Sequence, residues 1–222
     1  MAKRKLKKFA EVASFSNTVA LLYEDIQKGL PQKGKWHSDF FKNNNPLVLE
    51  LGCGKGEYTV GLAKKYPNKN FIGMDIKGNR LWTGAKFADE NKMNNVGFVR
   101  TRIDFIEACY AKDEVNEIWI TFPDPQPQTP RERKRLTNQR FLNRYKNLIK
   151  PDGIIHLKTD SKPLWEYTLE VIKEHKYQLI CATDNLYKET ASEFSDAASI
   201  QTHYETLFRA KGFDICYLQF RL

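Results

Sequence analysis

The chain has 222 residues, four cysteines and a formal net charge of +9, from 36 lysines and arginines against 27 aspartates and glutamates. This length suits one α/β domain with extensions, which buries a core without disulfides or metals. The cysteines and histidines show no metal-ligand spacing, and no apolar run is long enough to cross a membrane. We therefore expect a cytoplasmic protein, a monomer or homodimer, with reduced thiols, no metal and no membrane contact.

Strand-like apolar runs alternate with helical patterns along most of the chain. The predicted strands cover residues 47–51, 70–76, 96–102, 117–122, 153–159, 177–183 and 215–221. The predicted helices cover residues 58–65, 80–91, 139–148, 163–175 and 202–211. This alternation is typical of βαβ units, and it predicts an α/β fold with a mostly parallel sheet.

The end of the chain departs from this alternation. Residues 213–222 alternate in polarity with no crossover helix after them, so they suit a last strand that is inserted antiparallel. Seven strands with this ending resemble the Rossmann-like fold of class I S-adenosylmethionine-dependent methyltransferases. We expect a basic N-terminal extension at 1–46, a methyltransferase domain at 47–222 and a mobile polar loop at 184–200.

The first predicted strand ends at an acid and then breaks into glycines at alternate positions. Glu50 is followed by Gly52, Gly54 and Gly56, and glycine permits close approaches that a side chain blocks. Open α/β sheets bind ligands where such a strand leads through a loop into a helix. The G-x-G-x-G form resembles the first motif of methyltransferases that bind S-adenosylmethionine. A simple glycine-rich turn and a nucleotide loop are the alternatives, although the phosphate-binding string G-x-x-x-x-G-K-[ST] is absent.

Acids also close the next two predicted strands. Asp75 ends the second strand at the offset from the glycines at which an acid reaches ribose hydroxyls. Asp104 ends the third strand, where it can accept a hydrogen bond from an adenine amino group or cap a helix. Glu50 can bind the ammonium end of the cofactor or order the glycine loop. Because S-adenosylmethionine offers hydroxyl and amino groups but no phosphate, these acceptors suit it.

The fourth predicted strand runs into Phe122-Pro123-Asp124-Pro125. The two prolines fix the backbone and hold Asp124 at the carboxyl edge of the strand. Amino-methylating enzymes carry an N/D-P-P-aromatic motif at the same place, so we expect the substrate there. A proline-rich loop with a capping acid is the alternative.

A basic stretch follows this motif. Its cations, interrupted by one acid, are Arg131, Arg133, Lys134, Arg135, Arg140, Arg144, Lys146 and Lys150. A second basic run lies in the first eight residues. Each can be a solvated charged face, and the basic start has a transit peptide as a weak alternative. Contact with phosphates explains both runs at once and predicts a nucleic-acid partner.

Six motifs in order resemble those of the bacterial tRNA (guanine-N7)-methyltransferases. They are Glu50-Leu51-Gly52-Cys53-Gly54-Lys55-Gly56, Gly73-Met74-Asp75-Ile76-Lys77, Phe122-Pro123-Asp124-Pro125, Lys134-Arg135-Leu136, Leu157-Lys158-Thr159-Asp160 and Thr202-His203-Tyr204-Glu205. Many methyltransferases share the glycine motif, whereas the combination of F-P-D-P with the late T-x-Y-E is a far more specific signal. The resemblance covers nearly the whole chain and implies methyl transfer from S-adenosylmethionine to N7 of a guanosine in the tRNA variable loop.

The resemblance also implies roles for individual residues. The cofactor residues would be Glu50, Gly52, Gly54, Asp75, Asp104 and Asp124, with Asp124 also the catalytic residue. The residues that bind tRNA would be Gln128, Arg131, Arg133, Lys134, Arg135, Asp160, Thr202, Tyr204 and Glu205. The family often has Trp and Lys where this chain has Gln126 and Gln128, so the substrate role of Gln128 stays open.

Three other functions fit part of the pattern. A methyltransferase of another nitrogen, such as an exocyclic amine of a nucleic acid, keeps the cofactor site. A spermidine-synthase-like aminopropyl transferase shares the fold, but the basic stretch beside Asp124 opposes a polycationic substrate. An RNA-binding module with a vestigial cofactor pocket is the third, and the acids at successive strand ends argue against it.

Overall fold

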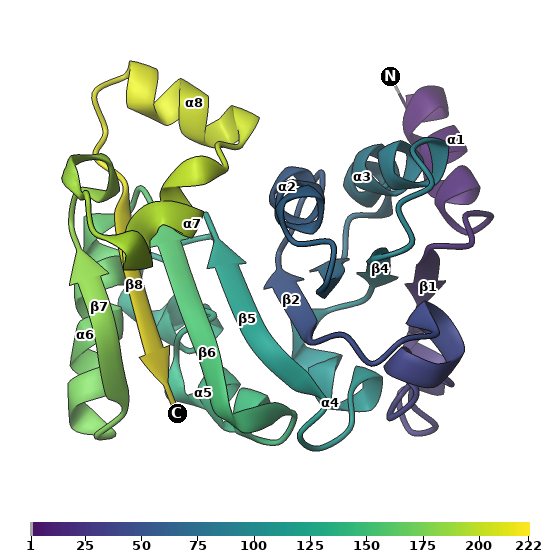
Figure 1. Cartoon of the computed structure of the whole chain (residues 1–222), viewed down its shortest axis with the longest axis horizontal. Helices are drawn as coiled ribbons and strands as arrows, with labels where there is room; N and C mark the ends of the chain where they lie inside the picture. The colour runs from purple at the N-terminus through teal and green to yellow at the C-terminus, as the bar shows by residue number, and fades with distance from the viewer. Residues whose placement is uncertain (1) are drawn as a thin grey trace.

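The computed structural model describes residues 2–222, with side chains from Lys7 onward. A single eight-stranded sheet has the order β1-β4-β3-β2-β5-β6-β8-β7, and helices surround it (Figure 1). The strands are β1 (Thr18–Ala20), β2 (Leu47–Leu51), β3 (Asn70–Asp75), β4 (Val96–Arg100), β5 (Val115–Thr121), β6 (Ile149–Thr159), β7 (Gln178–Thr183) and β8 (Cys216–Arg221). None of the helices in these residues is long and apolar enough to cross a membrane.

The helices fall into two groups by type. The α-helices are α1 (Ala2–Val12), α2 (Glu57–Lys65), α3 (Gly78–Glu90), α4 (Ile106–Cys109), α5 (Gln139–Lys146), α6 (Lys162–Glu174), α7 (Ser195–Ser199) and α8 (His203–Ala210). The short 3-10 helices are η1 (Tyr23–Asp25), η3 (Ile103–Phe105), η4 (Thr129–Lys134), η5 (Leu186–Lys188) and η6 (Ser192–Phe194), and η2 (Trp36–Phe41) is a π-helix.

The sheet confirms the predicted α/β fold and corrects its strand count. All seven predicted strands are present, and β1 is an eighth that pairs in parallel with β4 at one edge. The sequence did not reveal β1 because it has only three residues and is not fully buried. The final strand, β8, lies between β6 and β7. It is antiparallel to both, which confirms the predicted direction of the last strand.

The two faces of the sheet pack against different helices. On one face, α4, α5 and α6 share a core with strand residues such as Ile118 and Leu157. On the other, α2, α3 and α7 pack over Phe98 and Trp119. Strands covered on both faces have continuous apolar sequences, and all five residues of β2 are accordingly buried.

Parts of the N-terminal segment before residue 47 also pack against the sheet and its helices. α1 lies against α3, where Lys8 Nζ is 3.8 Å from the centre of the Trp82 ring and Trp82 Nε1 donates to Glu11. Trp36 is fully buried in the core. The division of the chain into an extension and a methyltransferase domain at residue 46 stays a prediction.

The segment at 184–200 is not the polar loop that we expected. It contains η5, η6 and α7, and it buries Leu186, Phe194 and Ala197. Three apolar residues at irregular spacing leave no helical period in the sequence, which explains the wrong prediction. Figure 1 shows α7 and α8 beyond the arrowheads of β5 and β6, where the parallel strands end.

A buried ion pair joins this segment to the sheet. The side chains of Lys158 on β6 and Glu205 on α8 have no exposed surface, and Nζ lies 2.8 Å from Oε2. The same amine donates to the carbonyl oxygens of Ala197 at 2.6 Å and Ile200 at 2.9 Å. One lysine therefore holds the end of α7, the linker that follows it and the first turn of α8.

Glu205 also organises the start of α8. Its carboxylate accepts from the Tyr187 hydroxyl at 2.5 Å and from the Thr202 backbone N–H at 3.4 Å. Thr202 Oγ1 accepts in return from the Glu205 N–H at 3.1 Å, which completes a capping box. Burial lowers the pKa of the Lys158 amine to about 8, and the charge of Glu205 opposes that shift. Because an unpaired buried charge is costly, the two side chains depend on each other.

We expect Lys158→Met to lower the free energy of unfolding by about 3–5 kcal/mol, because the Glu205 carboxylate is left buried without its cation. The double variant Lys158→Met/Glu205→Gln should recover a large part of that loss, because no unpaired charge then remains inside. Urea unfolding of both variants and the unsubstituted protein measures the difference. A loss below about 1 kcal/mol in Lys158→Met, or no recovery in the double variant, contradicts this role of the pair.

Candidate active site

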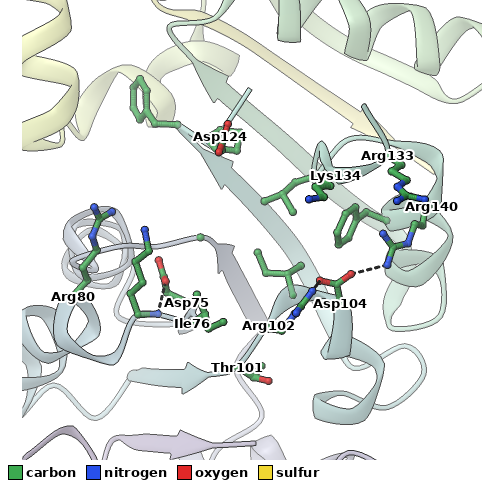
Figure 2. A pocket seen from close by; sticks show the side chains of 17 residues that line it. Asp75, Ile76, Arg80, Thr101, Arg102, Asp104, Asp124, Arg133, Lys134 and Arg140 are labelled. Carbon is green, nitrogen blue, oxygen red and sulfur yellow. Dashed lines mark hydrogen bonds and ion pairs between the residues drawn. The ribbon is translucent and has the colours of Figure 1, made fainter. Parts of the chain in front are cut away.

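The candidate site lies at the switch point of the sheet, between the carboxyl ends of β2 and β5. β3 and β4 continue the sheet on one side of this point, and β6 continues it on the other. Ligands of open α/β sheets bind outside such a point. Two pockets with volumes of about 800 Å³ and 530 Å³ open there. They share Gly52, Arg80, Phe122, Pro123 and Asp124, so they form one continuous cleft, and Figure 2 shows the larger pocket.

The glycine loop presents its backbone to this cleft. Gly52 and Gly54 have φ angles of 78° and 56°, in the left-handed region that glycine permits. A Cβ added at either position would meet no atom within 4 Å, so a ligand can approach both backbones closely. At Gly56, by contrast, a Cβ would lie 2.6 Å from the Phe98 ring. Gly56 therefore serves packing, whereas Gly52 and Gly54 suit the predicted cofactor contact.

The carboxylate of Glu50 is hydrogen-bonded within the protein. It accepts from the Thr59 N–H at 2.8 Å, from Thr59 Oγ1 and from Thr121 Oγ1 at 2.6 Å. Burial raises the pKa of this carboxyl to about 7, against the hydrogen bonds from Thr121 and Thr59. The bonds tie the end of β2 to α2 and β5, which orders the glycine loop. The residue also borders the smaller pocket, and its contact with a cofactor stays a prediction.

Asp75 ends β3 on the larger pocket. Its Oδ2 accepts from the Gly54 N–H at 3.0 Å, and its Oδ1 accepts from the Lys77 N–H at 2.7 Å. Each carboxylate oxygen has a second lone pair, so both can still accept a ligand hydroxyl. The two backbone bonds hold the carboxylate beside the glycine loop, where the predicted ribose contact requires it.

Asp104 faces two arginines in the same pocket (Figure 2). Its Oδ1 lies 2.7 Å from Arg140 Nη2, and its Oδ2 lies 3.2 Å from Arg102 Nη2. The alternative role as a helix cap is not observed, because neither η3 nor α4 has a side-chain cap. Since Arg140 belongs to α5, the ion pair links this acid to the basic stretch. Contact with an adenine amino group stays a prediction.

Asp124 lies between two residues in an unusual backbone conformation. Phe122 and Gln126 have φ angles of 46° and 45°, which residues other than glycine rarely adopt. Asp124 Oδ1 accepts from the Gln126 N–H at 3.1 Å, and Arg135 Nε donates to the Gln126 carbonyl at 3.3 Å. Strained backbone of this kind persists where its surroundings hold it, and it clusters at active sites. The turn places the exposed Asp124 on the boundary between the two pockets.

The start of α8 forms the wall of the smaller pocket opposite the glycine loop. Thr202, His203 and Tyr204 line it. The Glu57 carboxylate at the start of α2 accepts from the His203 N–H at 2.9 Å, so one hydrogen bond ties the two walls together. Asp160 directly follows the end of β6, and its charge adds to burial in raising the pKa of the Tyr204 hydroxyl. Two of the predicted substrate residues, Thr202 and Tyr204, thus line one wall of this pocket.

The basic stretch divides into exposed and anchored residues. Arg133 and Lys134 line the larger pocket, and both are exposed, as is Arg131. The Arg135 side chain is only 13% exposed, and its guanidinium lies 4.2 Å from the centre of the Tyr167 ring. The first three are available for phosphates, whereas Arg135 supports the loop around Asp124. Their RNA contacts stay predictions.

Some predicted residues lie outside the cleft, and some lining residues were not predicted. Gln128 is exposed at the start of η4, and Glu205 is buried beneath the wall that it supports. The sequence prediction gave no role to Arg80, which lines both pockets. It placed Arg140 only in the basic stretch expected to contact phosphates, not beside Asp104. It also gave no role to Lys158, although a lysine within an apolar strand is an unusual feature that signals a buried partner.

The donor set of the cleft fits S-adenosylmethionine. Asp75 and Asp104 place carboxylates on the larger pocket, as the predicted nucleoside contacts require, and Gly52 and Gly54 leave room for a ligand against the backbone. Over the described part of the chain, no group of three or more histidine, cysteine or acidic residues is placed to hold a metal ion. The four cysteines are free thiols.

The chain is similar to known proteins over almost its whole length. Residues 44–218 match a family model described as "Putative methyltransferase". A protein of Christiangramia forsetii named tRNA (guanine-N(7)-)-methyltransferase is 49% identical over 222 residues, which cover 100% of this chain and 99% of that protein. One of the same name from Bacteroides thetaiotaomicron is 47% identical, over 100% of this chain and 87% of the other.

Solved structures share the fold at low sequence identity. The 16S rRNA methyltransferase KamB superposes with a TM-score of 0.61 and 14% identity, over 80% of this chain and 88% of KamB. An antibiotic-related methyltransferase superposes with a TM-score of 0.62 and 16% identity, over 92% of this chain and 96% of the other. These two similarities concern the fold alone. The full-length relatives, at nearly half identity, establish more: the chain belongs to the tRNA (guanine-N7)-methyltransferase family.

Proposed function

We propose that this protein transfers a methyl group from S-adenosylmethionine to N7 of a guanosine in the variable loop of tRNA. The observation that carries the proposal is the position of Asp124, which borders both pockets. The larger pocket, with Asp75 and Asp104, suits the nucleoside part of the cofactor. The smaller lies between the glycine loop and Tyr204, so the reactive end of the cofactor and the target base can meet there.

The chemistry requires positioning and charge stabilisation more than proton transfer. Guanine N7 has an in-plane lone pair, so its attack needs no general base. Bound S-adenosylmethionine supplies an electrophilic methyl group on a sulfonium, and the transfer leaves a positively charged purine. The Asp124 carboxylate can stabilise that developing charge and accept hydrogen bonds from the N1 and amino edge of guanine. In-line alignment of methyl group and N7 provides most of the remaining acceleration.

The RNA side of the proposal rests on the exposed cations beside Asp124. Arg131, Arg133 and Lys134 lie on the segment directly after the Asp124 turn. In an A-form duplex, N7 points into a deep and narrow major groove, so a loop or flipped nucleotide is a more accessible target. A tRNA substrate also supports the cytoplasmic location that we propose.

Asp124→Asn should lower kcat for tRNA methylation at least about hundredfold, because it removes the charge opposite the developing cation. The amide oxygen can still accept from the Gln126 N–H, so we expect the fold and tRNA affinity to change little. Asp89→Asn, at an exposed acid on α3, is the matched control and should leave turnover unchanged. Near-normal turnover of Asp124→Asn would exclude the proposed role.

Charge reversal in the double variant Arg133→Glu/Lys134→Glu should weaken tRNA binding and flatten its salt dependence, by about one unit of slope for each phosphate that the variant no longer binds. Lys112→Glu, at an exposed lysine before the amino end of β5, is the control on the opposite edge of the sheet. Fluorescence anisotropy with labelled tRNA at several salt concentrations measures both effects. An unchanged affinity and slope would remove these two residues from the interface.

A further inference from the structure

Four aromatic side chains form a row that leads from the cleft along α8. The centres of the Phe122 and Tyr204 rings are 5.6 Å apart, and those of Tyr204 and Phe208 are 4.3 Å apart in a stacked arrangement. Phe213, just beyond the helix, meets Phe208 edge-on at 5.5 Å. We call these four residues the aromatic row. Its first two members line the smaller pocket, so the row begins at the candidate active site.

The outer part of the row is open to solvent. Tyr204 is 45% exposed and Phe213 is 50% exposed, and the neighbouring Leu207 is 48% exposed. Contiguous exposed apolar surface of this kind marks interaction sites in soluble proteins. Its position beside the cleft connects it with the substrate rather than with a remote function.

Cations accompany the aromatic rings. Lys211 Nζ lies 5.2 Å from the centre of the Phe208 ring. The Arg209 guanidinium lies 3.5 Å from the centre of the Tyr187 ring, which borders a small hollow together with Phe213. Aromatic faces interleaved with cations are typical of surfaces that bind single-stranded nucleic acid, because bases stack on the rings and cations attract the phosphates.

We propose that the aromatic row is a stacking surface for unpaired tRNA nucleotides adjacent to the methylated guanosine. This inference rests on the proposed function, since it takes the target base to lie at Asp124. With that base in the cleft, the next nucleotides along the strand reach Tyr204 first and Phe213 last. Stacking on these rings tolerates any base, so the row contributes affinity and placement without selecting a sequence.

The test distinguishes stacking on the Phe213 ring from the contribution of this side chain to packing. Phe213→Leu keeps an apolar side chain against Phe208 but removes the aromatic face. We expect it to raise KM for tRNA about five- to tenfold while kcat and the Kd for S-adenosylmethionine stay within about twofold. Phe87→Ala, at a partly exposed aromatic residue on α3, is the control and should leave KM unchanged.

A fluorescent base reports stacking directly. With 2-aminopurine beside the target guanosine in a tRNA substrate, binding to the unsubstituted protein should quench the fluorescence, and binding to Phe213→Leu should quench it less. Equal quenching by the two proteins, with an unchanged KM, would overturn the inference. The proposed function would still stand as long as the unsubstituted protein methylates tRNA. Loss of a dimer in light scattering of Phe213→Leu would also overturn it, by showing that a second copy covers the row. No methylation of tRNA by the unsubstituted protein would refute the proposed function itself.

Discussion

The buried carboxylate of Glu50 joins the three elements that meet at the switch point of the sheet. It stands at the end of β2 and accepts hydrogen bonds from Thr59 in the first turn of α2 and from Thr121 at the end of β5. A buried acid is costly without such partners, so these hydrogen bonds persist. Because the glycine loop leads into α2 and the Asp124 turn follows β5, the bonds also fix the separation between the loop and the turn. Methyl transfer by alignment requires that fixed separation, because small displacements of the reacting groups lower the rate steeply.

Some charged residues of this protein hold structural elements in place, and others face the cleft. Lys158 and Glu205 are fully buried and hold the wall that carries Thr202 and Tyr204. Asp124 is exposed, as are the cations that follow it. The buried charges have specific partners and need no ligand, whereas the exposed charges can contact RNA. This division explains how a chain with a net charge of +9 keeps a rigid acidic site beside a basic surface.

The sequence predicted the parts of the fold with a strong local signal. β2 has the predicted bounds because an apolar run stops abruptly at an acid and glycines. β1, with three residues, has too little pattern to detect. In the site, Asp75, Asp104 and Asp124 all line the larger pocket. Asp75 ends β3, as predicted, but Asp104 does not end a strand: β4 ends at Arg100 and Asp104 lies in η3. The pairing of Asp104 with Arg140, like that of Lys158 with Glu205, depends on tertiary contacts between distant residues, which no local pattern contains.

The function proposed for this cleft is methylation of guanosine N7 in tRNA. The most direct measurement incubates the protein with unmodified tRNA and labelled S-adenosylmethionine, digests the RNA and identifies the labelled nucleoside by mass and retention time. We expect N7-methylguanosine from the variable loop. A different methylated nucleoside would contradict the assigned target, and cofactor binding without any transfer would contradict the assigned reaction.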